Sequence, residues 1–315
     1  MFNQILSSID DFVWGVPLIV LILAVGVFLT IRVKGLQIRL LPRAIKELFV
    51  NEKSGDSGEV SSFAALCTAL SANIVGVATA LVAGGPGALF WMWVAAFVGM
   101  ATKYSECLLA VKYRTVAEDG HIVGGPFYYI EKGMGTKWRW LAKIFAFFGV
   151  CVGLFGIGTF TQINGITNAV QTFFDPDKTW TVHMFGMDYS WTVVIAGVLL
   201  SICVALVVIG GIKRISSVSQ VVVPFMAVAY FVFALILIIC NITKVPAAVV
   251  TVVQGAFHPR AVTGGVVGSM FVAMQNGVAR GIFSNEAGLG SAPIAAAAAQ
   301  THEPVRQGLV SMTGT

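Results

Sequence analysis

Long runs without a charged residue constrain this chain more than any other feature of its sequence. A helix needs about 20 apolar residues to cross the roughly 30 Å of hydrocarbon in a bilayer. The charge-free runs that reach this length occupy residues 12–31, 60–102, 144–174, 189–212 and 215–243. A sixth apolar stretch, residues 264–299, is interrupted by Arg280 and Glu286. These runs predict an all-α integral membrane protein.

Composition excludes several other classes of protein. Apolar residues make up 57% of the chain and charged residues 11%, against roughly 25% charged in a soluble domain. The net charge of +5 is small and follows the predicted loops, so nucleic-acid binding is not expected. The cysteines and histidines show no metal-ligand spacing. We therefore expect neither an enzyme nor a structural metal site.

The runs divide into seven predicted spans. Residues 60–102 are too many for one helix, and the sequence Gly-Gly-Pro-Gly at residues 84–87 interrupts them. Glycine and proline break helices, so this run predicts two spans joined by a tight hairpin. Each of the other runs predicts one span, including residues 144–174.

The distribution of lysine and arginine orients the predicted spans, because cytoplasmic loops carry the excess of these residues. With the N-terminus outside, the outer loops hold Lys178, Lys244 and Arg260. The inner loops and helix ends then hold Arg32, Lys34, Arg39, Arg43, Lys46, Lys53, Lys112, Arg114, Lys132, Lys137, Arg139, Lys143, Lys213, Arg214 and Arg306. We therefore predict an extracytoplasmic N-terminus.

Polar groups in the hydrocarbon core must be hydrogen-bonded, so polar residues inside the second and fourth predicted spans require an explanation. The second span contains Asn73 and Gly76, and the fourth contains Gln162 and Asn164. One interpretation is close helix packing through small residues, with the amides as interhelical hydrogen bonds. The other is a polar cavity wall. In the third span, Lys103 and Glu106 are expected to pair and reach the inner membrane surface.

The seventh span gives the strongest indication of a binding site. Glycines flank Ser284 and Asn285, and Pro293 follows. The helix is therefore weakened close to the charged residues Arg280 and Glu286. A broken helix frees backbone N–H and C=O groups as ligands. The alternative is that Arg280 and Glu286 form a structural ion pair that stabilises the break.

The second and seventh spans occupy matching positions five spans apart and run in opposite directions. Two interrupted helices in inverted units are typical of a transport site at the membrane midplane. The sequence therefore favours a secondary transporter.

Four segments resemble the alanine-or-glycine:cation symporter family of bacteria and archaea. They read GVATALVAGGPGALFWMW, GMATKYSE, GGPFYYIEKGMG and RGIFSNEAGLGSAPIA. The resemblance implies a single transmembrane domain with the five-plus-five inverted-repeat fold of the leucine-transporter type. Residues 12–32 would form an extra N-terminal helix, residues 60–243 the first repeat, and residues 264–315 the start of an incomplete second repeat.

The resemblance also implies sodium-coupled, or proton-coupled, uptake of small neutral amino acids through the bacterial inner membrane, with no further cofactor. The sequence does not identify the sodium ligands, for which backbone near Ala72 and Asn73 is a candidate. The implied substrate-binding residues are Asn73, Gly76, Gln162, Gly281, Phe283, Ser284 and Asn285.

The chain departs from the family pattern in two places. About five residues, including two glycines, are missing between Ala72 and Asn73, and the chain ends at Thr315, early in the second repeat. These departures predict a chain that inserts into the membrane but does not transport. An inactive relic is therefore the alternative function, and a channel is a weaker one because no continuous polar path is evident.

Overall fold

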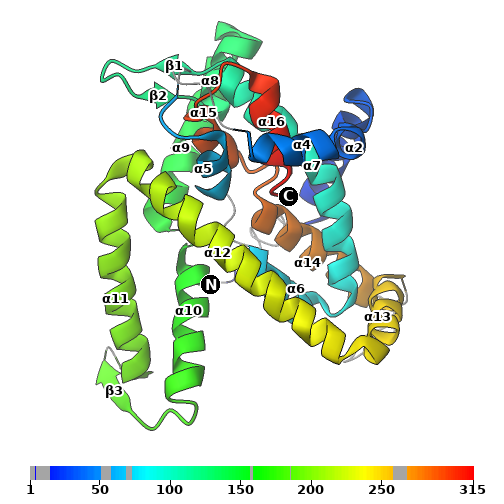
Figure 1. The fold of residues 1–315 in the computed structure, drawn as a ribbon, viewed down its shortest axis with the longest axis vertical. Helices are drawn as coiled ribbons and strands as arrows, with labels where there is room; N and C mark the ends of the chain where they lie inside the picture. Colours follow the sequence, from blue (N-terminus) through cyan, green and yellow to red (C-terminus); the bar gives the residue numbers. More distant parts are fainter. Residues whose placement is uncertain are drawn as a thin grey trace.

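The computed structural model describes residue 4 and residues 15–50, 58–68, 73–156, 159–184, 186–257 and 268–315, and it is mainly helical (Figure 1). The N-terminal helices are α2 (Val16–Arg32), α3 (Leu36–Arg39), α4 (Leu41–Leu48), α5 (Ser62–Thr68), α6 (Asn73–Gly84) and α7 (Gly87–Lys112). The middle of the chain forms α8 (Pro126–Met134), α9 (Arg139–Phe155), α10 (Thr159–Phe174), α11 (Trp191–Val208) and α12 (Gly211–Cys240). The remaining helices are α13 (Val245–Phe257), α14 (Gly268–Asn285), α15 (Ala292–Ala297) and α16 (Pro304–Met312).

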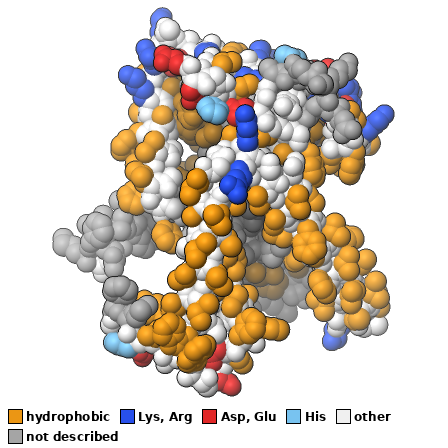
Figure 2. All heavy atoms as spheres, turned by 60° about the vertical axis from the view of Figure 1, so that its left-hand side comes forward, with side chains coloured by type: hydrophobic (Ala, Val, Ile, Leu, Met, Phe, Trp, Pro, Cys, Tyr) orange, Lys and Arg blue, Asp and Glu red, His pale blue; other side chains and the backbone are white. Residues whose placement is uncertain are grey.

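The apolar helices support an integral membrane protein. Among the residues that the structure describes, four stretches are long and apolar enough to cross a bilayer: Gly87–Lys112, Thr136–Phe155, Trp191–Val208 and Gly211–Cys240. Two shorter apolar stretches, Val16–Arg32 and Ile242–Phe257, accompany them. Hydrophobic side chains cover the outside of the helices, and most charged side chains gather at one end of the molecule (Figure 2). A continuous apolar surface of this extent is typical of a protein that contacts lipid.

The structure confirms the predicted hairpin and corrects the fourth span. Helix α6 ends at Gly84 and α7 begins at Gly87, as the glycine–proline sequence predicts. The run at residues 144–174 was predicted as one helix, but it forms α9 and α10. Gly156 ends α9 in the left-handed conformation with φ 60°, which glycine adopts without steric cost. Helix α13 was not predicted.

Helices α6, α7 and α14 form the packed centre of the described chain. Helix α14 packs against both α6 and α7, and α2 and α16 also pack on α7. Glycines allow close approach. The backbone of α14 at Gly277 lies directly against the Ala88 carbonyl of α7, and Val278 is fully buried. This close packing sets the register between α14 and its neighbours.

Two antiparallel hairpins, which the sequence did not predict, connect helices at opposite ends of the molecule (Figure 1). Strand β1 (Thr115–Val116) pairs with β2 (Ile122–Val123). Strand β3 (Thr181–Met184) pairs with β4 (Met187–Ser190) between α10 and α11.

Candidate functional site

The seventh predicted span is interrupted, as expected, but the break lies further along the chain than the expected residues. Helix α14 continues through Asn285, and α15 begins at Ala292. Between them, Glu286, Gly288 and Gly290 have positive φ values of 51°, 90° and 78°. A left-handed residue cannot continue a right-handed helix. Gly281, Ser284 and Asn285 therefore lie in the last turns of α14, before the break.

Helices α6 and α14 run antiparallel and touch at two predicted site residues. A methyl group placed on Gly76 would overlap the hydroxyl oxygen of Ser284 and lie 3.0 Å from its Cβ. At the other end of the contact, a methyl on Gly84 would lie 2.9 Å from the Cβ of Asn276. The Ser284 hydroxyl is buried and has no hydrogen-bond partner among the described residues. The amino end of α6 and the carboxyl end of α14 therefore meet beside the break.

Two charged residues of α7 contact the backbone at this break. The Nζ of Lys103 donates a hydrogen bond of 2.6 Å to the main-chain oxygen of Asn285. Glu106, three residues further along α7, accepts a hydrogen bond from the N–H of Gly288. The side chain of Lys103 has no exposed surface. The expectation that Lys103 reaches the membrane surface beside Glu106 was therefore wrong.

The charges within α14 and the break do not form the alternative ion pair. Glu286 accepts a hydrogen bond of 3.0 Å from the Ser291 hydroxyl. In the described part of the chain, Arg280 has no ion pair with Glu286. The hydroxyl of Ser291, rather than a guanidinium, holds this carboxylate at the break.

The other predicted site residues are more scattered. Gly281 faces α7, where a methyl group would lie 3.2 Å from the Cβ of Ala95, and Phe283 is half-buried. Gln162 is also half-buried but lies on α10, which packs on α11 and stands apart from α14 in Figure 1. Asn73 is the first residue of α6, and its side chain lies outside the described residues. So does Ala72, with the expected gap and sodium-binding backbone.

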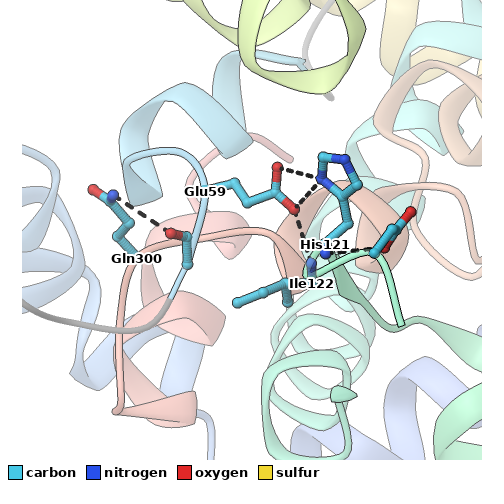
Figure 3. Close-up of polar contacts among 6 residues, drawn as sticks. Glu59, His121, Ile122 and Gln300 are labelled. Atoms are coloured by element: carbon cyan, nitrogen blue, oxygen red, sulfur yellow. Dashed lines mark hydrogen bonds and ion pairs between the residues drawn. The ribbon is translucent and has the colours of Figure 1, made fainter. Parts of the chain in front are cut away.

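A main-chain bridge joins the segment before α5 to the segment after α15, and the Gln300 side chain donates to the Gly58 carbonyl beside it (Figure 3). Val60 and Ala299 pair in parallel. The N–H of Glu59 donates to the carbonyl of Ala298 at 2.8 Å, and the N–H of Gln300 donates to the carbonyl of Val60 at 2.7 Å. The segment before α5 and the segment after α15 are thus tied directly to each other.

Side chains extend this bridge to the β1–β2 hairpin and to the end of α7. The Glu59 carboxylate accepts from the N–H of Ile122 at 2.8 Å and contacts Nδ1 of His121 at 3.2 Å (Figure 3). Arg114 donates to the carbonyls of Ala297, Ala299 and Thr301 at 2.6–2.9 Å. Sequence patterns did not indicate these roles, because a loop glutamate or arginine has no periodic signature.

A cavity of about 690 Å³ lies between α10 and α11, beside the β3–β4 hairpin and away from the break. It is lined mainly by apolar residues of α10 and α11, with Asp175 and Thr179 at its polar end. Burial acts to raise the pKa of Asp175. Hydrogen bonds from the Thr179 N–H, the Ser190 and Thr179 hydroxyls and the Trp180 N–H outweigh this effect and hold the pKa below its ordinary value. Asp175 therefore organises the β3–β4 hairpin.

Comparisons with known proteins identify one family over the whole chain. The profile of the sodium:alanine symporter family matches residues 1–315. An uncharacterized transporter of Haemophilus influenzae is 56% identical over 99% of this chain and 66% of its own length. The sodium/alanine symporter AgcS of Methanococcus maripaludis is 47% identical over 100% of this chain and 67% of its own. The probable sodium/glutamine symporter GlnT of Bacillus subtilis is 37% identical over 100% and 62%. The chain spans about two thirds of the length of these relatives.

Proposed function

The chain belongs to the sodium:alanine symporter family, and from this premise we propose that it carries small neutral amino acids, alanine or glycine, across a bacterial inner membrane together with sodium. The coupling ion is sodium, as in the name of the relative AgcS, with the proton as the second candidate. Substrate and ion bind to the same state, so the ion gradient drives uptake.

The meeting of α6 and α14 at Gly76 and Ser284 is the observation that carries this proposal. The first N–H groups and the last C=O groups of a helix lack partners within that helix. They also carry the positive and negative ends of the helix dipole. Since the amino end of α6 lies beside the carboxyl end of α14, the two ends complement the carboxylate and the ammonium of a zwitterionic amino acid.

The proposed site extends from this pair of helix ends. Ser284 offers its buried hydroxyl, and Asn285, which is 9% exposed, lies next to the break. Phe283 limits the size of the substrate side chain. Asn73, Gln162 and Gly281 remain proposed members of the same site.

The proposed architecture is the five-plus-five inverted repeat, with α2 as the extra helix, residues 60–243 as the first repeat and residues 264–315 as part of the second. The segments that carry α5 and α6 and those that carry α14 and α15 would then be equivalent. We place the N-terminus outside the cytoplasm because basic residues favour the loops at the other side. A reporter that fluoresces in the cytoplasm alone, fused before Met1, should stay dark, and a bright fusion would contradict this topology.

Uptake into proteoliposomes tests the function in a repaired, full-length version with the five residues before Asn73 restored, because the chain without them is predicted not to transport. An inward sodium gradient should drive accumulation of labelled alanine, and an equal potassium gradient should not. Asn285→Ala should reduce sodium-dependent uptake at least tenfold, because the residue adjoins the freed backbone of the break. Its abundance in the membrane should stay near that of the unsubstituted protein.

Competition separates the possible substrates. Unlabelled alanine and glycine should suppress uptake more strongly than glutamine, the substrate in the name of the relative GlnT. Uptake that is equal in the two salts would contradict symport. Full uptake by Asn285→Ala would remove this residue from the proposed site.

A further inference from the structure

Lys103 and Glu106 are buried charged residues that the proposed transport site does not explain. Both lie on α7, one turn apart. Lys103 contacts the main-chain oxygen of Asn285, and Glu106 contacts the main-chain N–H of Gly288. The break also packs on α7 nearby, where a methyl on Gly99 would lie 3.2 Å from the Cβ of Ala287. One face of α7 therefore supports the whole break.

The ammonium group of Lys103 suits the end of α14. The last carbonyls of a helix carry partial negative charge and lack intrahelical donors. Lys103 supplies a cationic donor at 2.6 Å to the carbonyl of Asn285, the last residue of α14. A fully buried ammonium is unfavourable unless it is paired and hydrogen-bonded. Its presence at this carbonyl therefore has a specific structural reason.

The carboxylate of Glu106 suits the other side of the break. Gly288 has φ 90°, outside any helix, so its N–H has no helical partner, and the carboxylate of Glu106 accepts it. The second oxygen of Glu106 is buried and has no partner among the described residues. One turn of α7 thus provides a donor for the carbonyl before the break and an acceptor for the amide after it.

We infer that Lys103 and Glu106 are positioning residues that hold the α14–α15 break open, and so fix Ser284 and Asn285 against α6. This inference rests on the proposed function for its consequence in substrate binding. Its structural content, the protection of backbone at residues 285–288, is independent of transport. The two parts can therefore be measured separately.

Hydrogen exchange of the purified full chain in detergent tests the structural part. Glu106→Leu removes the acceptor and should speed exchange in peptides covering the break at least tenfold. Glu106→Gln keeps an acceptor oxygen at the same place and should stay within threefold of the unsubstituted chain. Equal acceleration in both variants would indicate a role of charge alone and would overturn the inference.

Lys103→Met removes the donor with little change in side-chain length. We expect exchange at the break to rise at least tenfold, because the end of α14 loses its cap. Ser105→Ala is the matched control on the same helix, since its hydroxyl bonds to the Ala101 carbonyl of α7 at 2.8 Å. This control should stay within twofold. Unchanged exchange in Lys103→Met would overturn the inference.

The double variant Lys103→Met/Glu106→Gln separates hydrogen bonding from charge balance. It removes one positive and one negative charge, so the net charge of the cluster with Glu286 is unchanged. It still lacks the donor to Asn285. We expect hydrogen exchange at the break to stay accelerated. The apparent affinity of sodium-dependent alanine binding should stay at least tenfold below that of the unsubstituted chain. Full recovery in the double variant would show charge balance instead and overturn the inference.

Alanine binding distinguishes the two proposals. If the unsubstituted chain binds no alanine while the exchange pattern is as expected, the proposed function fails and the positioning of the break stands. If the unsubstituted chain binds alanine and Lys103→Met binds it equally well, the function stands and Lys103 does not position the site.

Discussion

Gly76→Ala tests the contact between α6 and α14 most directly. The new methyl group would overlap the Ser284 hydroxyl oxygen and lie 3.0 Å from the Ser284 Cβ, whereas carbon atoms pack best about 3.5–4.0 Å apart. Rotation of the Ser284 side chain can move its oxygen, but its Cβ is fixed to α14. The helices must therefore separate by several tenths of an ångström.

Gly149→Ala on α9 is the matched control, because a methyl group there has no neighbour within 4 Å. The gain in helix propensity from glycine to alanine, about 1 kcal/mol, is common to both variants and cancels in the comparison. The difference that remains is the cost of overpacking, about 1–3 kcal/mol. At about 2–4 °C per kcal/mol, Gly76→Ala should melt roughly 2–12 °C below Gly149→Ala.

Thermal unfolding of the two variants in one detergent, followed by size-exclusion chromatography of the soluble fraction, measures this difference. Gly76→Ala/Ser284→Ala should recover part of the loss, since the overlapping oxygen is gone while the contact between the two β-carbons remains. Equal melting midpoints for Gly76→Ala and Gly149→Ala would refute the register of α6 against α14, and with it the proposed site.

Two further predictions concern the β3–β4 hairpin and the second span. The pKa of folded Asp175 lies below the unfolded value near 3.9, so its ionised form stabilises the hairpin above about pH 4 and this stabilisation is lost as the pH falls through the folded pKa. Tryptophan fluorescence should report that transition, and Asp175→Asn should remove it; an unchanged transition in the variant would contradict the assignment. Inserting Thr-x-Gly-x-Gly between Ala72 and Asn73 should raise sodium-dependent alanine uptake at least tenfold, because five residues restore about 7.5 Å of rise and the glycines that unwind the helix. Equal uptake with and without the insertion would contradict the expectation that the gap impairs transport.

Features with a strong local signal could be predicted from the sequence. Charge-free runs predicted the apolar helices α2, α7, α11 and α12, and the glycine–proline sequence predicted the turn before Gly87. The family resemblance placed Gly76 and Ser284 in one site although they lie more than 200 residues apart, but their direct contact came from the structure. Each of these features depends on the composition of one short segment or on a simple symmetry between two.

Features that depend on the partner of a side chain could not be predicted. Lys103 and Glu106 stand three residues apart, and this spacing is equally typical of an ion pair on one helix face. Their contacts with the break required knowledge of which helix packs there. Similarly, Gly156, which ends α9 in the left-handed conformation, resembles the neighbouring Gly149 and Gly153 in sequence, so local composition did not show which of them would end the helix.

The bridge between Val60 and Ala299 has a consequence for the biosynthesis of this protein. Its strand-like segments lie about 240 residues apart, as shown by the 242-residue separation of Gly58 and Gln300. At about 5–20 residues per second, the ribosome needs roughly 10–50 s to make the second segment after the first. Throughout that interval the main-chain N–H and C=O groups before α5 must form hydrogen bonds with water or with the insertion machinery. Slower translation of the last quarter should therefore lengthen the period in which the nascent chain is vulnerable to proteases.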